Sequence, residues 1–268
     1  VINKMKKQLM LHIGLHKTGS TSIQAALKGY NKNKVRSIAF KEANHSIPMY
    51  TIFSEERYNY HIWQKEGLSK GDIDKKKNAY LNILIKEFKN NKVKTLIISG
   101  EDLSVLKDHE VKALSEFLMA QQIKTTIICY VRDPLSWVVS ASQEMAKNGG
   151  GTPNLDNFFK SRLQKYIKHF GKENIKVFDY QKSSLSEQSI VRHFSRVLSI
   201  NLKELPKTNE SLNPLQFSLI QNLNNINLKK KRHHSWDIIV SKIIKIGSMS
   251  SLYSGKKLDK QYFKNLIP

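Results

Sequence analysis

The sequence predicts an α/β fold in which helices cover both faces of a central, mainly parallel sheet, giving three layers. Short apolar segments typical of buried strands alternate along the chain with longer segments whose apolar residues recur at helical spacing. The strand expected at 124–131 is apolar without a break through its centre, as expected when both faces of a sheet are covered. A chain of 268 residues is long enough to form a single domain of this kind.

The first strand is expected at 8–13, and a loop separates it from a helix over 20–29. A polar connection leads to a short strand at 37–40. Residues 41–71 mix histidine, tryptophan and tyrosine without sustained periodicity. We interpret this segment either as an irregular lid or as an irregular insertion that faces the acceptor substrate.

Two further strands follow, each preceded by a helix. Apolar residues recur at helical spacing over 73–88, which predicts a helix before the strand at 95–99. A second helix has its apolar residues between 111 and 118 and leads to the strand at 124–131. Strands that alternate with helices favour a parallel sheet with right-handed crossovers.

The later part of the chain continues this pattern. Helices are expected at 134–147 and 154–168, and a strand at 175–180. The sequence Ser-Leu-Ser-Glu at 184–187 is typical of a capping box and predicts that a helix begins there. An Asn-Pro pair predicts another helix over 213–228, because asparagine caps a helix and proline suits its first position.

The composition is strongly basic. Lys and Arg total 45 against 22 Asp and Glu, a formal net charge of +23. This excess predicts attraction to anions such as nucleic acid, anionic lipid or acidic glycans, although a surface rich in solvated lysines explains it equally well. Cys129 is the only cysteine, so an intramolecular disulfide is excluded. The apolar runs are too short to span a bilayer and no signal peptide is recognised, so a cytoplasmic location is expected.

The stretch from Leu11 to Gln24 carries the clearest functional signal. Its loop holds two glycines, a lysine and four hydroxyl residues between a strand and a helix. Such a loop directs several backbone amides and the positive end of a helix dipole toward one point. A phosphate or sulfate group is therefore expected to bind there.

The order of residues in this loop separates two enzyme classes. In the loop of nucleoside triphosphatases and related kinases the lysine follows the last glycine, whereas Lys17 precedes Gly19. The sequence Lys17-Thr18-Gly19-Ser20-Thr21 instead resembles the phosphosulfate loop of the sulfotransferase family, especially of its bacterial carbohydrate-type members. The longer stretch from His12 to Gln24 extends the resemblance.

A second motif supports the same resemblance. Arg132-Asp133-Pro134 follows the strand at 124–131, and Ser140 lies eight positions after the arginine. Sulfotransferases have an arginine at a strand end and a serine on the next helix, which hold the 3′-phosphate of their donor. An arginine fork and a hydroxyl suit a phosphate group. The alternative is that Arg132 pairs with a neighbouring carboxylate, Asp133 included.

The resemblance implies a P-loop-like fold and the donor 3′-phosphoadenosine 5′-phosphosulfate, with 3′,5′-adenosine bisphosphate as the product and no metal. Lys17 would neutralise charge on the bridging oxygen as the 5′-phosphate leaves. Backbone amides and hydroxyls of the loop would hold that phosphate. The residues implied in donor binding are Lys17, Thr18, Gly19, Ser20, Thr21, Ser22, Arg132 and Ser140. The alternative for Lys17 is a surface lysine without a catalytic role.

The acceptor hydroxyl requires a base, and two residues are candidates. Glu101 directly follows the strand at 95–99, on the same sheet edge as Lys17, and a glutamate has this role in several glycan sulfotransferases. The alternative is that Glu101 or Asp102 caps the next helix. His16 is the second candidate, because imidazole titrates near neutral pH. His12 lies within the strand and is expected to be buried and hydrogen-bonded.

The C-terminal residues 229–268 are basic, with ten Lys or Arg and two acids. Apolar residues at helical spacing predict a helical extension, which would either lie on an anionic membrane, including the inner membrane surface, or pack on the core. His233 and His234 are interpreted as part of this basic surface. A glycan or a lipid-linked acceptor would suit such a protein. Asn209-Glu210-Ser211 also resembles a loop of bacterial members, without an assigned role.

Three classes of function account for different parts of these observations. A sulfotransferase accounts for the loop, for Arg132 with Ser140 and for the sheet. A P-loop kinase accounts for the sheet and a phosphate site, but not for the position of Lys17. A nucleic-acid-binding protein accounts only for the charge, and no motif that reads specific nucleic-acid sequences is recognised.

Overall fold

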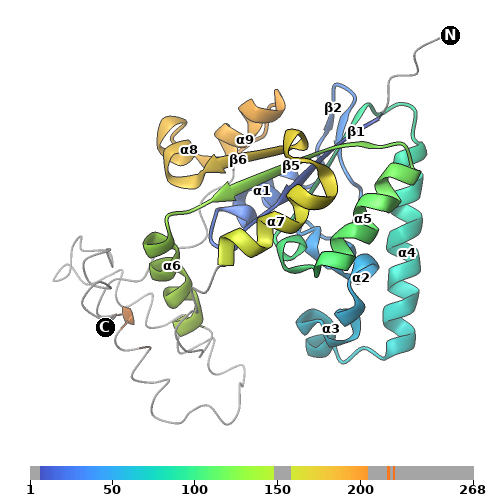
Figure 1. Cartoon of the computed structure of the whole chain (residues 1–268), viewed down its shortest axis with the longest axis horizontal. Helices are drawn as coiled ribbons and strands as arrows, with labels where there is room; N and C mark the ends of the chain where they lie inside the picture. Colours follow the sequence, from blue (N-terminus) through green and yellow to red (C-terminus); the bar gives the residue numbers. More distant parts are fainter. Residues whose placement is uncertain (1–6, 148–157, 205–215, 218–219, 221–268) are drawn as a thin grey trace. The chain divides into compact units, whose positions relative to one another are not determined.

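The computed structural model describes residues 7–147, 158–204, 216–217 and 220 (Figure 1). The chain divides into two compact units, one comprising Val1–Val131 with Asn157–Pro206 and the other Arg132–Asp156 with Lys207–Pro268. The helix expected at 213–228 and the basic extension at 229–268 lie outside the residues that can be described, apart from three isolated positions.

The first unit contains a six-stranded sheet in the order β2-β3-β4-β1-β5-β6. Neighbouring strands are parallel except for the antiparallel pair β2 and β3. The prediction of a central, mainly parallel sheet flanked by helices is therefore confirmed. The strands are β1 (Gln8–Ile13), β2 (Asn31–Lys32), β3 (Val35–Ser37), β4 (Thr95–Gly100), β5 (Lys124–Val131) and β6 (Ile175–Asp179).

Helices connect the strands and cover both faces of the sheet. Figure 1 shows α8 and α9 on one side of the strands, and α4 and α5 on the other. The α-helices of this unit are α1 (Ser20–Leu27), α2 (Ser46–Phe53), α3 (His61–Glu66), α4 (Lys70–Lys89), α5 (Asp108–Ala120), α7 (Phe158–Phe170), α8 (Tyr180–Ser186) and α9 (Ile190–Leu198). The other unit contributes α6 (Pro134–Lys147) to the described residues.

The alternation of side chains along the strands produces two apolar clusters, one on each face. In β1, Leu9, Leu11 and Ile13 face a cluster that includes residues of α2, α4, α5 and α7. Met10, on the opposite face, packs with residues of α1 and α9. Burial on both faces explains why the centres of the strands are apolar. The sheet and the helices on its two faces form the three layers expected from the sequence.

Residues 41–71 differ from the expected irregular segment, because they contain α2, the 3-10 helix η1 (Glu55–Asn59) and α3. Their regular structure is stabilised by burial. Met49 and Trp63 are almost fully buried in the larger apolar cluster. The helices are too short to show a sustained period of 3.6 residues in the sequence, and their apolar residues take part in the core.

The expected strand at 37–40 is displaced. Residues before it form a hairpin, in which β2 and β3 are joined by Asn33 and Lys34. Both turn residues have positive φ angles, 51° and 63°. A two-residue turn of this kind usually has glycine at one position. Because neither position holds a glycine here, no sequence pattern indicated the hairpin.

The helix expected to begin at 184 begins later. Residues 180–186 form α8, whose first turn is capped by the Asp179 side chain through the amide of Lys182. Gln188 then adopts a φ of 61°, and the next helix, α9, is capped by Ser189 through the amide of Val191 at 3.1 Å. The cap thus comes from Ser189, five residues beyond the predicted serine.

The strand order places the loop after β1 at a position that favours ligand binding. From β1 the chain passes to β3 on one side of the sheet, whereas from β5 it reaches β6 on the other side. Strands whose connections diverge in this way leave a crevice beyond their carboxyl ends, where α/β proteins bind ligands. The loop that follows Ile13 lies at this edge.

Candidate functional site

The loop between β1 and α1 passes through left-handed backbone twice. Lys17 has a φ of 68° and Gly19 a φ of 76°. A lysine rarely adopts this conformation, and such strain is concentrated at functional sites. Gly19 also has little room for a side chain, since an added Cβ would lie 2.9 Å from Ile190 Cγ2. The loop conformation therefore requires a glycine at position 19.

The first turn of α1 presents backbone donors to this loop. The carbonyl of Gly19 accepts hydrogen bonds from the amides of Ser22 at 3.1 Å and Ile23 at 3.3 Å. The amides of Ser20 and Thr21 come earlier in the first turn, where N–H groups have no acceptor within the helix and point beyond its N-terminus. This geometry is the one expected of an anion site, with the helix dipole adding a partial positive charge.

The hydroxyl residues of the loop have different roles. Thr18 is fully buried, and its hydroxyl donates to the carbonyl of Leu15, which closes the loop. Ser20 is only 3% exposed, and its Oγ is a buried polar atom without a hydrogen-bond partner. Thr21 and Ser22 are exposed. A buried hydroxyl of this kind is suited to a ligand oxygen or a water molecule, so the loop fits a bound phosphate group.

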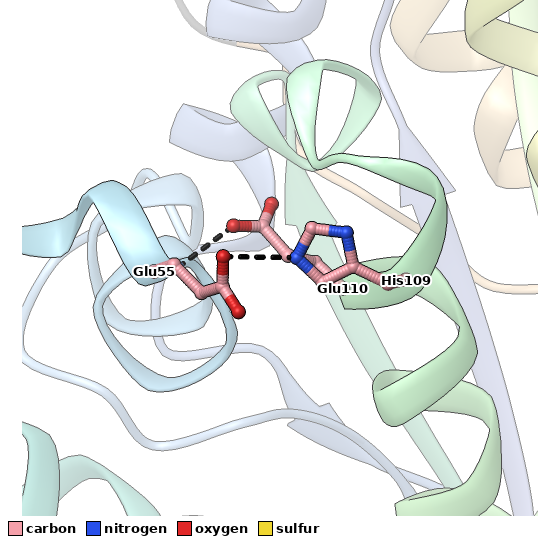
Figure 2. Close-up of side chains that lie close together, drawn as sticks. All are labelled: Glu55, His109 and Glu110. Carbon is pink, nitrogen blue, oxygen red and sulfur yellow. Dashed lines mark hydrogen bonds and ion pairs between the residues drawn. The ribbon is translucent and has the colours of Figure 1, made fainter.

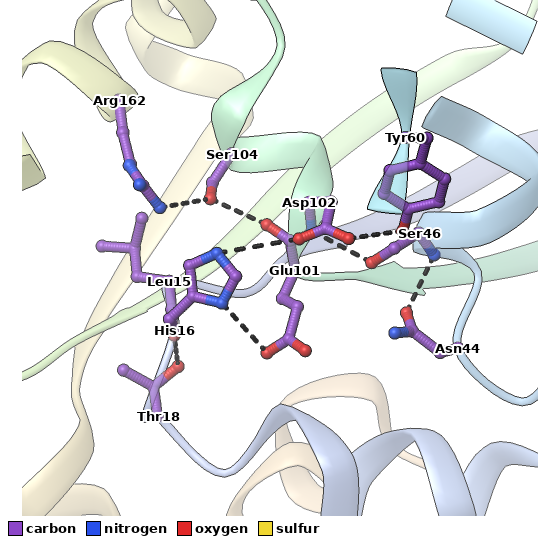
Figure 3. A network of polar contacts seen from close by, with 10 residues as sticks. All are labelled: Leu15, His16, Thr18, Asn44, Ser46, Tyr60, Glu101, Asp102, Ser104 and Arg162. Atoms are coloured by element: carbon purple, nitrogen blue, oxygen red, sulfur yellow. Dashed lines mark hydrogen bonds and ion pairs between the residues drawn. The ribbon is translucent and has the colours of Figure 1, made fainter. Parts of the chain in front are cut away.

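The end of β4 lies directly beside the phosphate loop. Ile13 pairs with Gly100 at the ends of β1 and β4, so that His16 and Glu101 come together from the two following segments. His16 Nδ1 lies 3.7 Å from Glu101 Oε2, and His16 Nε2 lies 3.7 Å from Asp102 Oδ1 (Figure 3). The structure thus brings both candidate bases into one polar cluster.

The pKa of His16 is lowered by this environment. Burial is the largest cause, and the positive charges of Arg162, Lys17 and His61 act in the same direction, while the carboxylate of Asp102 opposes them. Burial disfavours the charged imidazolium. His16 is therefore neutral near pH 7, as a proton acceptor has to be.

Hydrogen bonds with Tyr60 and Ser46 hold Asp102 in place. The hydroxyl of Tyr60 donates to Asp102 Oδ2 at 2.6 Å, and the backbone amide of Asp102 donates to Ser46 Oγ at 3.0 Å. The side chain of Asp102 is 13% exposed, against 25% for Glu101. Glu101 occupies the N-cap position of the 3-10 helix η2 (Asp102–Val105), and its side chain makes no capping hydrogen bond there.

Helix α7 holds η2 in place from the other side. The guanidinium of Arg162 donates to Ser104 Oγ at 3.2 Å, and Ser104 Oγ in turn donates to the carbonyl of Glu101 at 2.7 Å. The Tyr166 hydroxyl donates to the carbonyl of Leu103 at 2.6 Å. Burial lowers the pKa of Arg162 to about 10. These bonds fix the backbone from which Glu101 and Asp102 project.

The start of α2 packs tightly against the end of β4. A Cβ at Gly100 would lie 2.7 Å from the backbone nitrogen of Ser46, so only glycine allows this approach. The amide of Ser46 donates to Asn44 Oδ1 at 2.9 Å. The segment expected to form an irregular insertion therefore supplies Ser46 and Tyr60, which contact Asp102 (Figure 3).

His12 is buried within β1, as expected. Its Nδ1 atom lies 2.8 Å from Ser99 Oγ, and its ring contacts Tyr130 and Phe194. Burial lowers its pKa to about 3. His12 is therefore a neutral residue of the core rather than part of the polar cluster.

Arg132 and Ser140 belong to the second unit. Asp133 caps α6, because its Oδ2 atom accepts from the amide of Ser136 at 3.0 Å and from the Ser136 hydroxyl at 2.9 Å. Pro134 occupies the first helical position. Ser140 is partly exposed, about 9 Å along the axis from Pro134 at 1.5 Å per residue. The binding of a 3′-phosphate by Arg132 and Ser140 stays a prediction.

Within the described ranges, one group of side chains has metal-ligand character: Glu55, His109 and Glu110 (Figure 2). Hydrogen bonds account for its geometry. Glu110 accepts from the amides of Glu55 and Lys107, both at 2.7 Å, and His109 Nε2 lies 3.0 Å from Glu55 Oε2. Glu110 also lies in the first turn of α5, where the helix dipole favours an anion over a cation. These residues are better explained as a helix cap than as a metal site.

Tyr60 and Arg162 were not expected from the sequence. Each lies more than 40 positions from Asp102 along the chain, on a helix or turn whose position depends on tertiary packing. No motif marks either residue.

Across the described part of the chain, none of the helices combines the length and the apolar character needed to cross a bilayer.

No family model matches the chain, and no curated protein matches it. Among solved structures, a sulfotransferase from Alicyclobacillus acidocaldarius is similar, with 14% identity, a TM-score of 0.47 and 86% of this chain and 98% of the other covered. The sulfotransferase domain from the curacin biosynthetic pathway has 14% identity, a TM-score of 0.43 and coverage of 88% and 97%. The tunicamycin resistance protein of Deinococcus radiodurans has 10% identity, a TM-score of 0.42 and coverage of 74% and 99%.

Proposed function

We propose that this protein is a sulfotransferase that moves a sulfuryl group from 3′-phosphoadenosine 5′-phosphosulfate to an acceptor hydroxyl. The observation that carries the proposal is the conjunction at the β1 and β4 ends. A Lys-Thr-Gly-Ser-Thr loop with two left-handed residues, followed by a helix N-terminus, lies beside His16 and Glu101. Anion donors and a proton acceptor are both needed for group transfer between an anionic donor and a hydroxyl.

In the proposed reaction the acceptor oxygen attacks sulfur in line with the leaving 5′-phosphate. A new oxygen–sulfur bond forms, and the bond between sulfur and the bridging oxygen breaks. The hydroxyl proton passes to Glu101 or to His16. Lys17 and the amides from Thr18 to Thr21 stabilise the negative charge that develops on the departing phosphate. The product is 3′,5′-adenosine bisphosphate, and none of these steps requires a metal.

The second half of the proposal concerns the 3′-phosphate of the donor. Arg132 and Ser140 would hold it, since a guanidinium fork and a hydroxyl match phosphate oxygens. The neighbouring Asp133 caps α6 through its hydrogen bonds with Ser136.

The acceptor is proposed to be a glycan or a lipid-linked sugar. The net charge of +23 supports an anionic acceptor or an anionic membrane surface, and the cytoplasmic face of the membrane is the location that suits such a substrate. A P-loop kinase is the alternative for the same sheet and loop. Its lysine would follow the last glycine, whereas Lys17 precedes Gly19.

Transfer of radiolabelled sulfate tests the proposal. The protein is incubated with labelled donor and with extracts of glycans and of lipid-linked sugars, and label in the acceptor fraction is measured. Lys17→Ala is expected to abolish transfer. Lys28→Ala is the matched control, because Lys28 is an exposed lysine at the other end of α1 and should leave transfer unchanged. Equal transfer by both variants would contradict the assigned role of Lys17.

A further inference from the structure

The end of β4 extends beyond the strand that lies beside it. β3 ends at Ser37, which pairs with Ile97, and the amide of Ile38 donates to the carbonyl of Ile97 at 3.0 Å. Alternate residues of a parallel strand direct their backbone groups to the same side, so Ser99 is the next residue of β4 that faces this side. Ser99 is fully buried, and its amide and carbonyl therefore need partners there.

His45, at the N-cap of α2, supplies both partners. Its backbone amide donates to the carbonyl of Ser99 at 3.0 Å, and its Nδ1 atom accepts from the amide of Ser99 at 3.3 Å. The ring nitrogen thus takes the place that a carbonyl of a neighbouring strand would have. The His45 ring is buried and packs edge-on against Phe40, with ring centroids 5.3 Å apart, which restricts its orientation.

The bond with Ser99 decides which form of the His45 imidazole can be present. A backbone amide is only a donor, so the nitrogen that it meets must carry a lone pair. In a neutral imidazole the proton is then on the other nitrogen, Nε2. An imidazolium would place two N–H groups against each other. Burial favours the neutral form as well, because it lowers the pKa of His45 to about 4.

The next residue of α2 extends this contact toward the candidate base. A Cβ at Gly100 would lie 2.7 Å from the backbone nitrogen of Ser46, and Ser46 Oγ accepts from the amide of Asp102 at 3.0 Å (Figure 3). Two successive residues, His45 and Ser46, therefore hold the backbone on both sides of Glu101.

We infer that His45 is a positioning residue that replaces a neighbouring strand beside Ser99, in its neutral tautomer with the proton on Nε2, and thereby fixes the turn that carries Glu101. This inference rests on the proposed function for its catalytic meaning. His45 acts through the backbone and takes no part in proton transfer. A base must be held accurately against the acceptor hydroxyl, since small displacements of reacting groups slow group transfer strongly.

Asparagine and leucine at position 45 separate the role of the acceptor atom from that of packing. Oδ1 of asparagine lies at the same distance along the side chain as Nδ1 of histidine, and it can accept from the Ser99 amide. Leucine has a branched shape similar to that of asparagine but no acceptor. Hydrogen exchange of the Ser99 amide should be faster by about 10-fold or more in His45→Leu, because its donor is left unpaired. In His45→Asn this exchange should stay close to that of the wild type.

Nuclear magnetic resonance of the ligand-free full chain measures the tautomer. Backbone assignment of the wild type identifies Ser99 and His45, and long-range proton–nitrogen spectra report which imidazole nitrogen carries the proton. At pH 7 the wild type is expected to have the proton of His45 on Nε2. His109→Leu is the control for both measurements, because the His109 ring is exposed on α5 and pairs with Glu55.

Sulfate transfer measures the positioning role. His45→Leu should lower kcat by about 10-fold or more, because Glu101 is no longer held in place. His45→Asn should keep most of the wild-type kcat. The Kd of 3′,5′-adenosine bisphosphate should be unchanged in both variants, since His45 lies on the turn after β4 and not on the loop after β1.

A wild-type proton on Nδ1, an imidazolium at pH 7, or equal exchange of the Ser99 amide in folded His45→Asn and His45→Leu would overturn the assigned hydrogen bond. Equal kcat in the two variants, with unequal exchange, would overturn the positioning role. Should His45→Leu not fold, the tautomer and His45→Asn decide: retained Ser99 protection and kcat support the inference, and loss of either overturns it. The spectra need neither donor nor acceptor, so a wild type that binds no nucleotide would count against the proposed function alone.

Discussion

His16 Nδ1 lies 3.7 Å from Glu101 Oε2, and this pair connects the loop after β1 with the turn after β4. The contact follows from the parallel pairing of Ile13 with Gly100 at the ends of the two strands. Two groups that accept protons are thereby placed beside Lys17, whose charge contributes to the lowered pKa of His16. Substituting His16 and Glu101 separately tests which of them removes the proton of the acceptor hydroxyl.

Glu101→Gln is expected to lower the turnover of sulfate transfer by about 100-fold or more, because a positioned base contributes about 10²–10⁴-fold. Binding of 3′,5′-adenosine bisphosphate should be retained. The measurement is kcat beside the Kd of the nucleotide. Glu116→Gln is the control, since Glu116 is exposed and pairs only with Lys112 on α5 among the contacts described. Full turnover in Glu101→Gln would assign the base to His16.

Gly19→Ala is expected to weaken nucleotide binding and to destabilise the fold by more than about 1 kcal/mol, since left-handed backbone costs a residue with a Cβ about 1–2 kcal/mol. The Cβ would also lie 2.9 Å from Ile190 Cγ2. In Gly29→Ala the φ is similar, at 71°, but no atom lies within 4 Å, so only the backbone cost applies. Urea denaturation and nucleotide titration of both variants compare the two effects.

If the two glycine variants lost equal stability and bound nucleotide equally well, the close packing of Gly19 would have no part in shaping the loop. A loss of binding confined to Gly19→Ala would support the assignment of residues 17–21 to the 5′-phosphate.

Arg132→Ala is expected to weaken binding of 3′,5′-adenosine bisphosphate by about 10- to 100-fold, because a hydrogen bond to a charged group contributes about 1.5–3 kcal/mol. Binding of adenosine 5′-phosphate should change little, since that nucleotide lacks the 3′-phosphate. Isothermal titration of both nucleotides measures the difference. An equal loss for both would show that Arg132 does not recognise the 3′-phosphate.

The fold is expected to lose stability below about pH 6.5. His12 has a pKa of about 3 and His45 a pKa of about 4 in the folded protein, both lowered by burial, against about 6.5 when unfolded. Between pH 6.5 and 4 the unfolded chain binds the extra protons, so each histidine lowers the free energy of unfolding as the pH falls, by about 1.4 kcal/mol per unit.

Urea denaturation at a series of pH values measures this slope. His12→Gln should reduce this slope of the free energy of unfolding against pH by the contribution of one bound proton. His45→Gln should reduce it by the same amount. His109→Gln is the control, since His109 is exposed. Identical slopes in the wild type and in His12→Gln would exclude the buried histidine as a source of the acid sensitivity.

The main strands and helices could be predicted because their sequence patterns reflect burial directly. β1, β4 and β5 are mainly apolar through their centres, and α4 has a clear period of 3.6 residues. The hairpin of β2 and β3 could not be predicted, because Asn33 and Lys34 adopt positive φ angles without a glycine. The short helices α2 and α3 depend on packing against the core, which no local pattern reveals.

The candidate site could be predicted only where neighbouring strands bring chain segments together. Lys17, His16 and Glu101 follow adjacent parallel strands, so their proximity follows from the order of the elements. The contacts of Asp102 with Tyr60 and Ser46 depend on how α2 and α3 pack, and those of Arg162 on the placement of α7. These residues carry no motif, and their roles emerge only from the folded chain.

The most direct test of the central claim is calorimetric binding of 3′,5′-adenosine bisphosphate in the presence of a chelator, compared with Mg²⁺-ATP. We expect the bisphosphate to bind without a divalent metal, and we expect this binding to be weakened in Lys17→Ala and unchanged in Lys28→Ala. At a ligand concentration of 100 times Kd, the bisphosphate should raise the free energy of unfolding by about 2.7 kcal/mol. Binding of Mg²⁺-ATP alone would contradict the account and assign the loop to a phosphoryl-transferring enzyme.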